Sequence, residues 1–174
     1  MNEFINLIKD RRSVREYIDK RIEKHVLEEI VDCARLAPSS RNIQPWDFIV
    51  VTDKTSLVQL SKNVPYGNFL KDAAACIVVC GQRHEHRHVE DCCLAAQNIM
   101  LSAKSLGIGT CYIAALEKDI GEARRLLKVP EKHEIVCFIS LGYFHSNPKI
   151  PKKKHTKQVI HWEKFSRKPR KVIF

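Results

Sequence analysis

The sequence lacks any apolar run long enough to cross a membrane. Its long apolar stretches, such as residues 76–81 and 135–142, have the length of strands, whereas a spanning helix needs roughly 18 or more apolar residues. The opening residues Met-Asn-Glu-Phe also lack the basic-then-apolar order of a secretory signal. We therefore expect neither a membrane partner nor export.

Several motifs that mark common enzyme classes are absent. There is no G-x-x-x-x-G-K-[ST] phosphate loop, no glycine elbow around a serine and no C-x-x-C pair. These absences disfavour P-loop nucleotide hydrolysis, triad hydrolysis and dithiol redox chemistry. Residues 106–111 read Leu-Gly-Ile-Gly-Thr-Cys, but they follow a predicted helix, enter a predicted strand and lack a third glycine, which argues against a Rossmann dinucleotide loop.

The seven cysteines are an odd number, and most of them lie in apolar runs. A free cysteine in such a run behaves as a small hydrophobic residue. Cys92 and Cys93 are neighbours on a predicted helix, so a zinc knuckle is not favoured either. We expect buried, reduced thiols and a cytoplasmic protein.

The formal net charge of +10 is concentrated at the C-terminal end. Residues 149–174 contain ten Lys or Arg residues and one acid, Glu163, whereas residues 1–148 are nearly neutral. A basic tail can bind nucleic acid, but it can equally supply cations to a phosphate-bearing cofactor. Because the body is neutral and has no recognition motif, we expect no nucleic-acid partner.

The same tail carries apolar side chains that a purely solvated basic extension would not need. They are Val159, Ile160, Trp162 and Phe165, followed by Val172, Ile173 and Phe174. We expect these groups to pack on a partner subunit.

Apolar periodicity predicts five helices and four strands. Their expected order is helix 4–8, helix 26–34, strand 48–51, helix 53–60, strand 75–80, helix 89–106, strand 111–114, helix 117–127 and strand 135–141. Strands covered by helices imply a layered sandwich of the α/β or α+β class. With no repeats or flexible linkers, we expect one domain, 1–148, with an extension, 149–174.

His84, His86 and His88 alternate in a segment that could ligate zinc or nickel. The alternation falls in a loop and lacks the fixed facial geometry of H-E-x-x-H on a helix, and Arg87 sits among the histidines. We therefore expect a solvated loop and no metal centre.

Two polar segments are unusual. Residues 11–15 place Arg11, Arg12, Ser13 and Arg15 between two predicted helices. Arginine suits bidentate phosphate contacts, although on composition alone a charged interhelical loop accounts for this segment more simply. Residues 37–46 are rich in short polar side chains and framed by prolines that stiffen them, so this loop can present hydrogen bonds on a fixed scaffold.

Together these segments resemble the nitroreductase family of FMN enzymes. The resemblance extends over about residues 4–165 and rests on shared order and spacing in the segments 11–17, 37–51, 88–98, 106–111, 127–131, 141–143 and 159–162. It implies an α+β fold, a layered α/β/α sandwich in which two intertwined subunits bind FMN at two shared sites.

The resemblance also implies site residues. Arg11, Arg12, Ser13 and Arg15 match the motif that contacts the phosphate, ribityl chain and pyrimidine edge of FMN. The residues that match the loop reaching the flavin from the partner subunit are Ser39, Ser40 and Asn42. Those that match the strand end behind the flavin ring are Tyr112, Ile113, Ala114 and Ala115.

Other positions match less directly. Lys153, with Lys154 as the alternative, stands where the family has a phosphate-binding arginine, and Asn68 is the candidate for its pyrimidine-side asparagine. Tyr112 stands where tryptophan is frequent, and Phe144 stands where proline often follows Gly-Tyr.

The implied activity is transfer of reducing equivalents from NAD(P)H to a small organic acceptor, such as a nitroaromatic or a quinone, by a ping-pong mechanism. The chemistry takes place on the cofactor, so no catalytic acid or base is needed. Arg15, and more remotely Lys71, could stabilise the charge of reduced flavin. The alternatives are a flavin-binding protein without turnover and a basic nucleic-acid-binding protein.

Overall fold

Helices and strands alternate along most of the chain in the computed structural model, which describes residues 2–116 and 119–166. The helices are α1 (Glu3–Asp10), α2 (Lys24–Arg35), α3 (Lys54–Asn63), α4 (His88–Ser105), α5 (Gly121–Leu126) and α6 (Thr156–Val159), with 3-10 turns η1 (Ser40–Asn42) and η2 (Asn68–Asp72). The strands are β1 (Trp46–Val51), β2 (Ala75–Gln82), β3 (Gly109–Ala114) and β4 (His133–Gly142).

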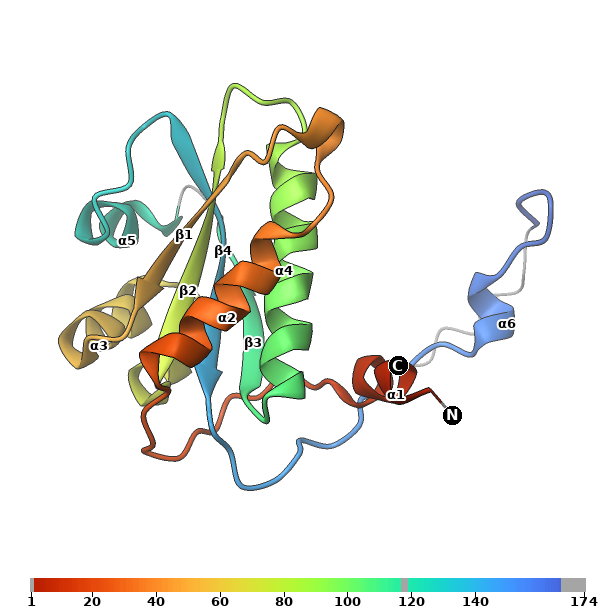
Figure 1. Ribbon diagram of the computed structural model, residues 1–174, viewed down its shortest axis with the longest axis horizontal. Helices are drawn as coiled ribbons and strands as arrows, with labels where there is room; N and C mark the ends of the chain where they lie inside the picture. The colour runs from red at the N-terminus through yellow and green to blue at the C-terminus, as the bar shows by residue number, and fades with distance from the viewer. Residues whose placement is uncertain (1, 117–118, 167–174) are drawn as a thin grey trace.

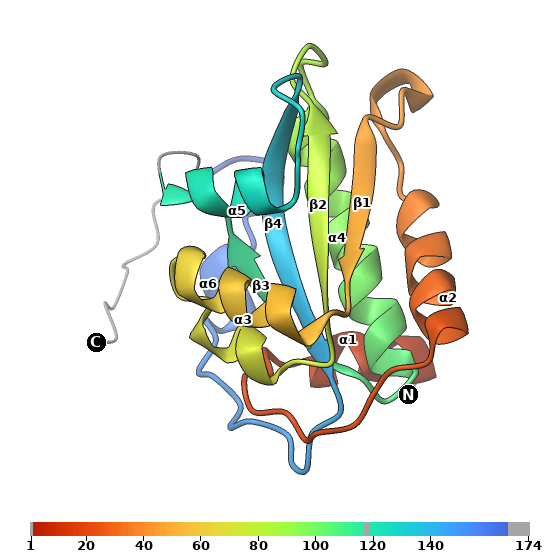
Figure 2. The same cartoon turned by 90° about the vertical axis from the view of Figure 1, so that its left-hand side faces the viewer.

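The strands form one sheet in the order β1-β2-β4-β3, and every neighbouring pair is antiparallel. Helices α2 and α4 cover one face, and α3 and α5 cover the other (Figure 1; Figure 2). The α+β layered sandwich is confirmed. The antiparallel pairing decides between the two classes that periodicity left open, because α/β folds are built on parallel strands.

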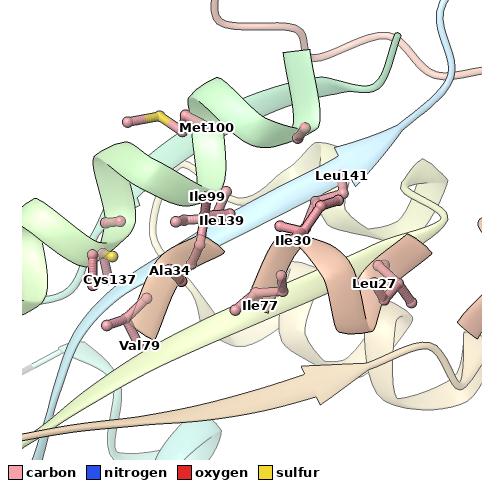
Figure 3. Packing of buried hydrophobic residues seen from close by; sticks show 14 of the residues in the cluster. Leu27, Ile30, Ala34, Ile77, Val79, Ile99, Met100, Cys137, Ile139 and Leu141 are labelled. Carbon is pink, nitrogen blue, oxygen red and sulfur yellow. The ribbon is translucent and has the colours of Figure 1, made fainter. Parts of the chain in front are cut away.

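Alternate residues of the two central strands supply two separate cores. Ile77, Val79 and Ile139 pack toward α2 and α4, as Figure 3 shows. Val78 and Phe138 point the other way, into the core under α3 and α5. This two-sided burial explains why β2 and β4 read as continuous apolar runs.

The cysteines largely follow the expectation of burial. All seven are free thiols, and five of them are buried. Burial raises the pKa of Cys76, Cys80 and Cys92 to about 12, so these thiols stay protonated and unreactive. Cys93 contradicts the expectation, because it lies on the exposed face of α4.

The helix boundaries agree with the sequence predictions to within about three residues, except at the start of α5. Helix α2 begins two residues before the expected range 26–34 and ends one residue after it, at Arg35. Asp53 is the N-cap of α3, and its Oδ2 accepts a 2.8 Å bond from the Ser56 backbone N–H. The helix expected over 117–127 is shorter: residues 117–118 lie outside the described part, and α5 begins only at Gly121.

The segment after β4 leaves the body of the protomer, and α6 stands apart from both helical layers (Figure 1). Its apolar side chains are open to solvent, with Val159 56%, Trp162 78% and Phe165 80% exposed. Residues 172–174, which belong to the same expectation of a packed arm, lie outside the described residues. Within the described ranges, no helix combines the length and apolar character needed to span a membrane.

Candidate functional site

The arginine segment 11–15 lies along the outer edge of β3. Ser13 forms a parallel bridge with Thr110, and the Val14 backbone N–H donates to the Thr110 carbonyl at 2.9 Å. Reading the segment as a free interhelical loop is therefore wrong. This pairing holds the backbone of the segment against β3 at Ser13 and Val14.

Glycines allow this close approach. A Cβ atom at Gly109 would lie 2.7 Å from the Phe144 ring and 2.8 Å from the Val14 side chain. On the next strand, the Tyr17 ring occupies the space beside Gly142. The Tyr17 hydroxyl reaches the Val14 carbonyl at 2.7 Å and Ser140 Oγ at 2.6 Å. The segment is thus attached to both β3 and β4.

A cavity of about 310 Å³ opens beside this segment at the end of β3. It is lined by Arg15, Pro65, Tyr66, Phe69, Cys111, Tyr112, Ile113, Ala114 and Leu116. The guanidinium carbon of Arg15 lies 5.8 Å from the centroid of the Phe69 ring, within the range of a cation–π contact. The cavity therefore combines apolar and aromatic walls with a cation at one end.

The thiol of Cys111 does not neutralise that cation. Burial raises its pKa, while Arg15, the Ser13 hydroxyl and Arg11 act in the opposite direction without reversing the shift. The group is therefore a neutral thiol at neutral pH. The positive charge of Arg15 is left available to an anionic ligand.

Arg11 and Arg12 face a different small hollow. They line it together with Lys104 and Asn147, at the C-terminal end of α4. Arg12 also donates through Nη1 to the Arg11 carbonyl at 2.7 Å and to the Lys9 carbonyl, so it caps the end of α1. In the protomer, Arg15 is thus the arginine of the segment that lines the apolar cavity.

The polar loop after α2 lies at the other end of α4, where it forms the orange turn at the top of Figure 1. There the Ser40 backbone N–H donates to both carboxylate oxygens of Asp91, at 3.2 and 3.1 Å. Helix α4 has 18 residues, which at about 1.5 Å per residue separates its ends by roughly 26 Å. The arginine segment lies at the C-terminal end of α4, where Arg11 and Arg12 share a hollow with Lys104 and Val14 packs beside Gly109. One protomer therefore does not bring Ser39, Ser40 and Asn42 to this segment.

The remaining predicted positions divide into two groups. Asn68 and Lys71 lie on η2, on either side of Phe69 and therefore close to the cavity. Lys153 and Lys154 are exposed on the segment between β4 and α6 and do not line the cavity. Ala115 lies just past β3, and its backbone N–H donates to the Val136 carbonyl.

Sequence reasoning missed several cavity residues, namely Pro65, Tyr66, Phe69, Cys111 and Leu116. Tyr66 is 89% exposed and adopts a left-handed φ of 61°, which is uncommon for a non-glycine residue. The sequence signal that could have identified this wall is an aromatic residue between a proline and a glycine, in the run Pro65-Tyr66-Gly67.

The histidine segment is partly structured, contrary to the expectation of a solvated loop. His88 Nε2 lies 3.0 Å from Glu134 Oε2, and Nδ1 lies 2.6 Å from the Glu85 carbonyl. Arg83 faces the same Glu134 carboxylate at 3.9 Å. Burial lowers the pKa of His88, but the contacts with Glu134 and the Glu85 carbonyl outweigh it, and the net pKa is raised.

This raised pKa predicts a pH-dependent contribution to stability. Since an unfolded histidine titrates near pH 6.5, the protonated ring stabilises the fold fully below about that pH, and the contribution is lost as the pH rises through the raised value. His88→Gln should therefore lower the melting temperature more at about pH 6 than at about pH 8.5. His86→Gln, at an exposed neighbour, is the control, and an equal loss for His88→Gln at both pH values would contradict the assignment.

The site is an apolar cavity with a cation at one end, on the edge of an antiparallel sandwich. Such a cavity suits a planar cofactor that carries negative charge, so the fold and the site together define a cofactor-binding protein. The profile of the nitroreductase family matches residues 8–65 and 58–143. An Archaeoglobus fulgidus protein named NADH dehydrogenase/NAD(P)H nitroreductase is 39% identical over 150 residues, covering 82% of this chain and 86% of that protein. The chain belongs to the nitroreductase family.

Solved structures agree with this assignment. A protein of the same description from Bacteroides thetaiotaomicron superposes with a TM-score of 0.88 at 33% identity, covering 95% of this chain and 99% of that one. An FMN-dependent nitroreductase from Clostridium difficile gives a TM-score of 0.85 at 35% identity, covering 92% and 99%.

Proposed function

We propose that this protein is an FMN-dependent oxidoreductase that transfers reducing equivalents from NAD(P)H to a small organic acceptor, such as a nitroaromatic or a quinone. The observation that carries the proposal is the cavity at the end of β3, where Arg15 stands over Phe69. Relatives named FMN reductase, from Bacillus subtilis, and FMN-dependent nitroreductase, from Clostridium difficile, support it.

The residues present fit FMN. Apolar walls from Phe69 and Ile113 suit a flat aromatic ring, and Arg15 suits its polar edge. Arg11, with Arg12 beside it, offers positive charge to a phosphate group. When bound, FMN supplies the hydride and electron chemistry.

The chain's own residues would bind and orient the cofactor. β3 is an edge strand, so alternate backbone N–H groups over Tyr112–Ala115 face away from β4 and are suited to donate to the ring. Arg15 would stabilise negative charge at the neighbouring edge of a bound flavin ring. Donor and acceptor would occupy the same open face in turn, which is the basis for a ping-pong mechanism.

The site is completed by a second copy of the chain. Ser39, Ser40 and Asn42 lie at the far end of α4 from Arg15, so they serve the site of the partner subunit. Exposed apolar side chains on α1 and α4 support a homodimer: Phe4 (61%), Ile5 (45%), Ile8 (47%), Val89 (39%) and Leu94 (46%). The exposed apolar residues of the extension 149–174 would pack on the same partner.

The extension would also supply phosphate-binding cations. Phe144 and Asn147, which precede the extension, lie beside Arg11 and Arg12. Lys153 is six residues further on, a span of at most about 20 Å in an extended chain. The family resemblance assigns a phosphate-binding cation to Lys153, or to Lys154 beside it, and this chain length allows that contact. The free thiols suit a reducing, cytoplasmic compartment.

The identity of the cofactor gives the test. The purified protein should be yellow and release about one FMN per chain on denaturation, identified by chromatography. The apoprotein should bind FMN more tightly than riboflavin, and Lys153→Ala should reduce that preference, because only FMN carries the phosphate. Release of FAD, or no flavin binding after reconstitution with excess FMN, would refute the proposal. Oxidation of NADH or NADPH with a quinone then distinguishes the enzyme from a flavin store.

A further inference from the structure

Asp91 is a buried acid that the site described above does not use. It is 6% exposed and lies in the first turn of α4, where the helix N-terminus favours a negative charge. Both of its oxygens accept from the Ser40 backbone N–H. We propose that Asp91 is the positioning residue that holds the loop 39–44 in the shape needed to contact the partner's flavin; the flavin contact itself rests on the function proposed above.

The loop has a backbone that needs external support. Arg41, Asn42 and Gln44 adopt left-handed φ values of 52°, 57° and 54°. Asparagine tolerates this region, but arginine and glutamine adopt it at a cost. Strained residues of this kind persist only where their surroundings determine the conformation, and they concentrate at binding sites.

Two kinds of hydrogen bond act on the loop. The Gln44 N–H donates to Ser39 Oγ at 2.9 Å, and the Ile43 N–H donates to the Ser40 carbonyl at 3.0 Å. These bonds set the shape of the loop but do not attach it to the body. The bonds to Asp91 connect the loop to α4, which also carries the exposed surface proposed to meet the partner.

A second anchor on the same helix provides a matched comparison. Asn98 lies two helical turns after Asp91, and its Nδ2 donates to the Cys33 carbonyl at 3.1 Å, near the end of α2. Losing Asn98 removes a hydrogen bond between α4 and α2, but leaves Ser40 held. The consequences of the two losses should therefore differ at the loop.

The first readout is free of flavin. Arg41 lies exposed within the loop, so trypsin cleavage after Arg41 reports how often the loop opens in the apoprotein. Asp91→Ala should speed this cleavage about tenfold and weaken FMN binding about tenfold, the range expected for losing a hydrogen bond to a buried charge. Asp91→Asn keeps one acceptor oxygen but loses the charge, so its cleavage rate and FMN affinity should fall between those of wild type and Asp91→Ala.

Controls separate positioning from general damage. Asn98→Ala and Glu90→Ala should change neither cleavage after Arg41 nor FMN binding; Glu90 is the exposed neighbouring acid, bonded to Arg87. If Asp91→Ala does not fold, Ser40→Pro removes the same hydrogen bond from the loop side, and the cleavage measurement applies to it. An unchanged cleavage rate in the folded Asp91 or Ser40 variant overturns the inference. If the Asp91 or Ser40 variant is cleaved faster but the wild-type protein binds no FMN, Asp91 does anchor the loop, and the proposed flavin function is refuted instead.

Discussion

A mixed dimer that contains one Arg15→Ala chain and one Asn42→Ala chain should recover about half of the wild-type activity, although each variant alone is expected to be inactive. Arg15 lines the cavity at the end of β3, and Asn42 lies beside the opposite end of α4. If each site takes its arginine from one chain and its asparagine from the other, the mixed dimer gathers both lesions in one site. The second site is then intact.

The measurement uses differently tagged chains, co-expressed and purified through both tags. A mixed dimer of Arg15→Ala with Arg11→Ala is the matched control, because those two residues belong to the same half of the site and each site then keeps one lesion. It should stay inactive. An inactive Arg15→Ala/Asn42→Ala dimer, or a fully active monomer by light scattering, would contradict the shared site.

The secondary structure was largely predictable because it depends on local patterns. The run 75–80 is apolar at every position and 135–141 is apolar except at Ser140, and in the structure both of their faces are buried. Helix α4 has acids in its first turn and is followed by Gly107 with a φ of +74°, which is how helices commonly end. Sequence alone could not establish the order of the strands, because pairing joins residues far apart in the chain.

The candidate site likewise has features that the sequence could predict and features that depend on tertiary contacts. The chemistry of the arginine segment was visible in its residue types, but its attachment to β3 depends on the bridge from Ser13 to Thr110. Likewise, the hydrogen bond from Ser40 to Asp91 joins residues 51 positions apart. The left-handed Arg41 and Gln44 carry no sequence signal, since glycine or asparagine marks such positions. The attachment of the arginine segment and the shape of the loop 39–44 therefore depend on tertiary contacts, which the sequence alone does not show.

The contact between the arginine segment and β3 leads to the other large expected effect, that of Gly109→Ala. Its Cβ would lie within 3 Å of both Val14 and the Phe144 ring. Val14 cannot easily retreat, because it is 3% exposed and its N–H is bonded to the Thr110 carbonyl. The added methyl group should therefore push the arginine segment away from the sheet and cost about 1–3 kcal/mol in the free energy of unfolding.

Gly121→Ala is the matched control, since it makes the same chemical change at the first residue of α5, where a Cβ atom would meet nothing within 4 Å. This variant should be neutral or up to about 1 kcal/mol more stable, because alanine favours a helix over glycine. Urea unfolding of the two apoproteins measures the stabilities, and titration with FMN measures whether Arg15 has moved from the cavity. Gly109→Ala should weaken FMN binding at least tenfold, the loss expected when a charged contact is displaced, whereas Gly121→Ala should leave it unchanged. Wild-type stability and affinity in Gly109→Ala would show that the segment does not depend on this close approach, and the explanation given for the glycine would then be wrong.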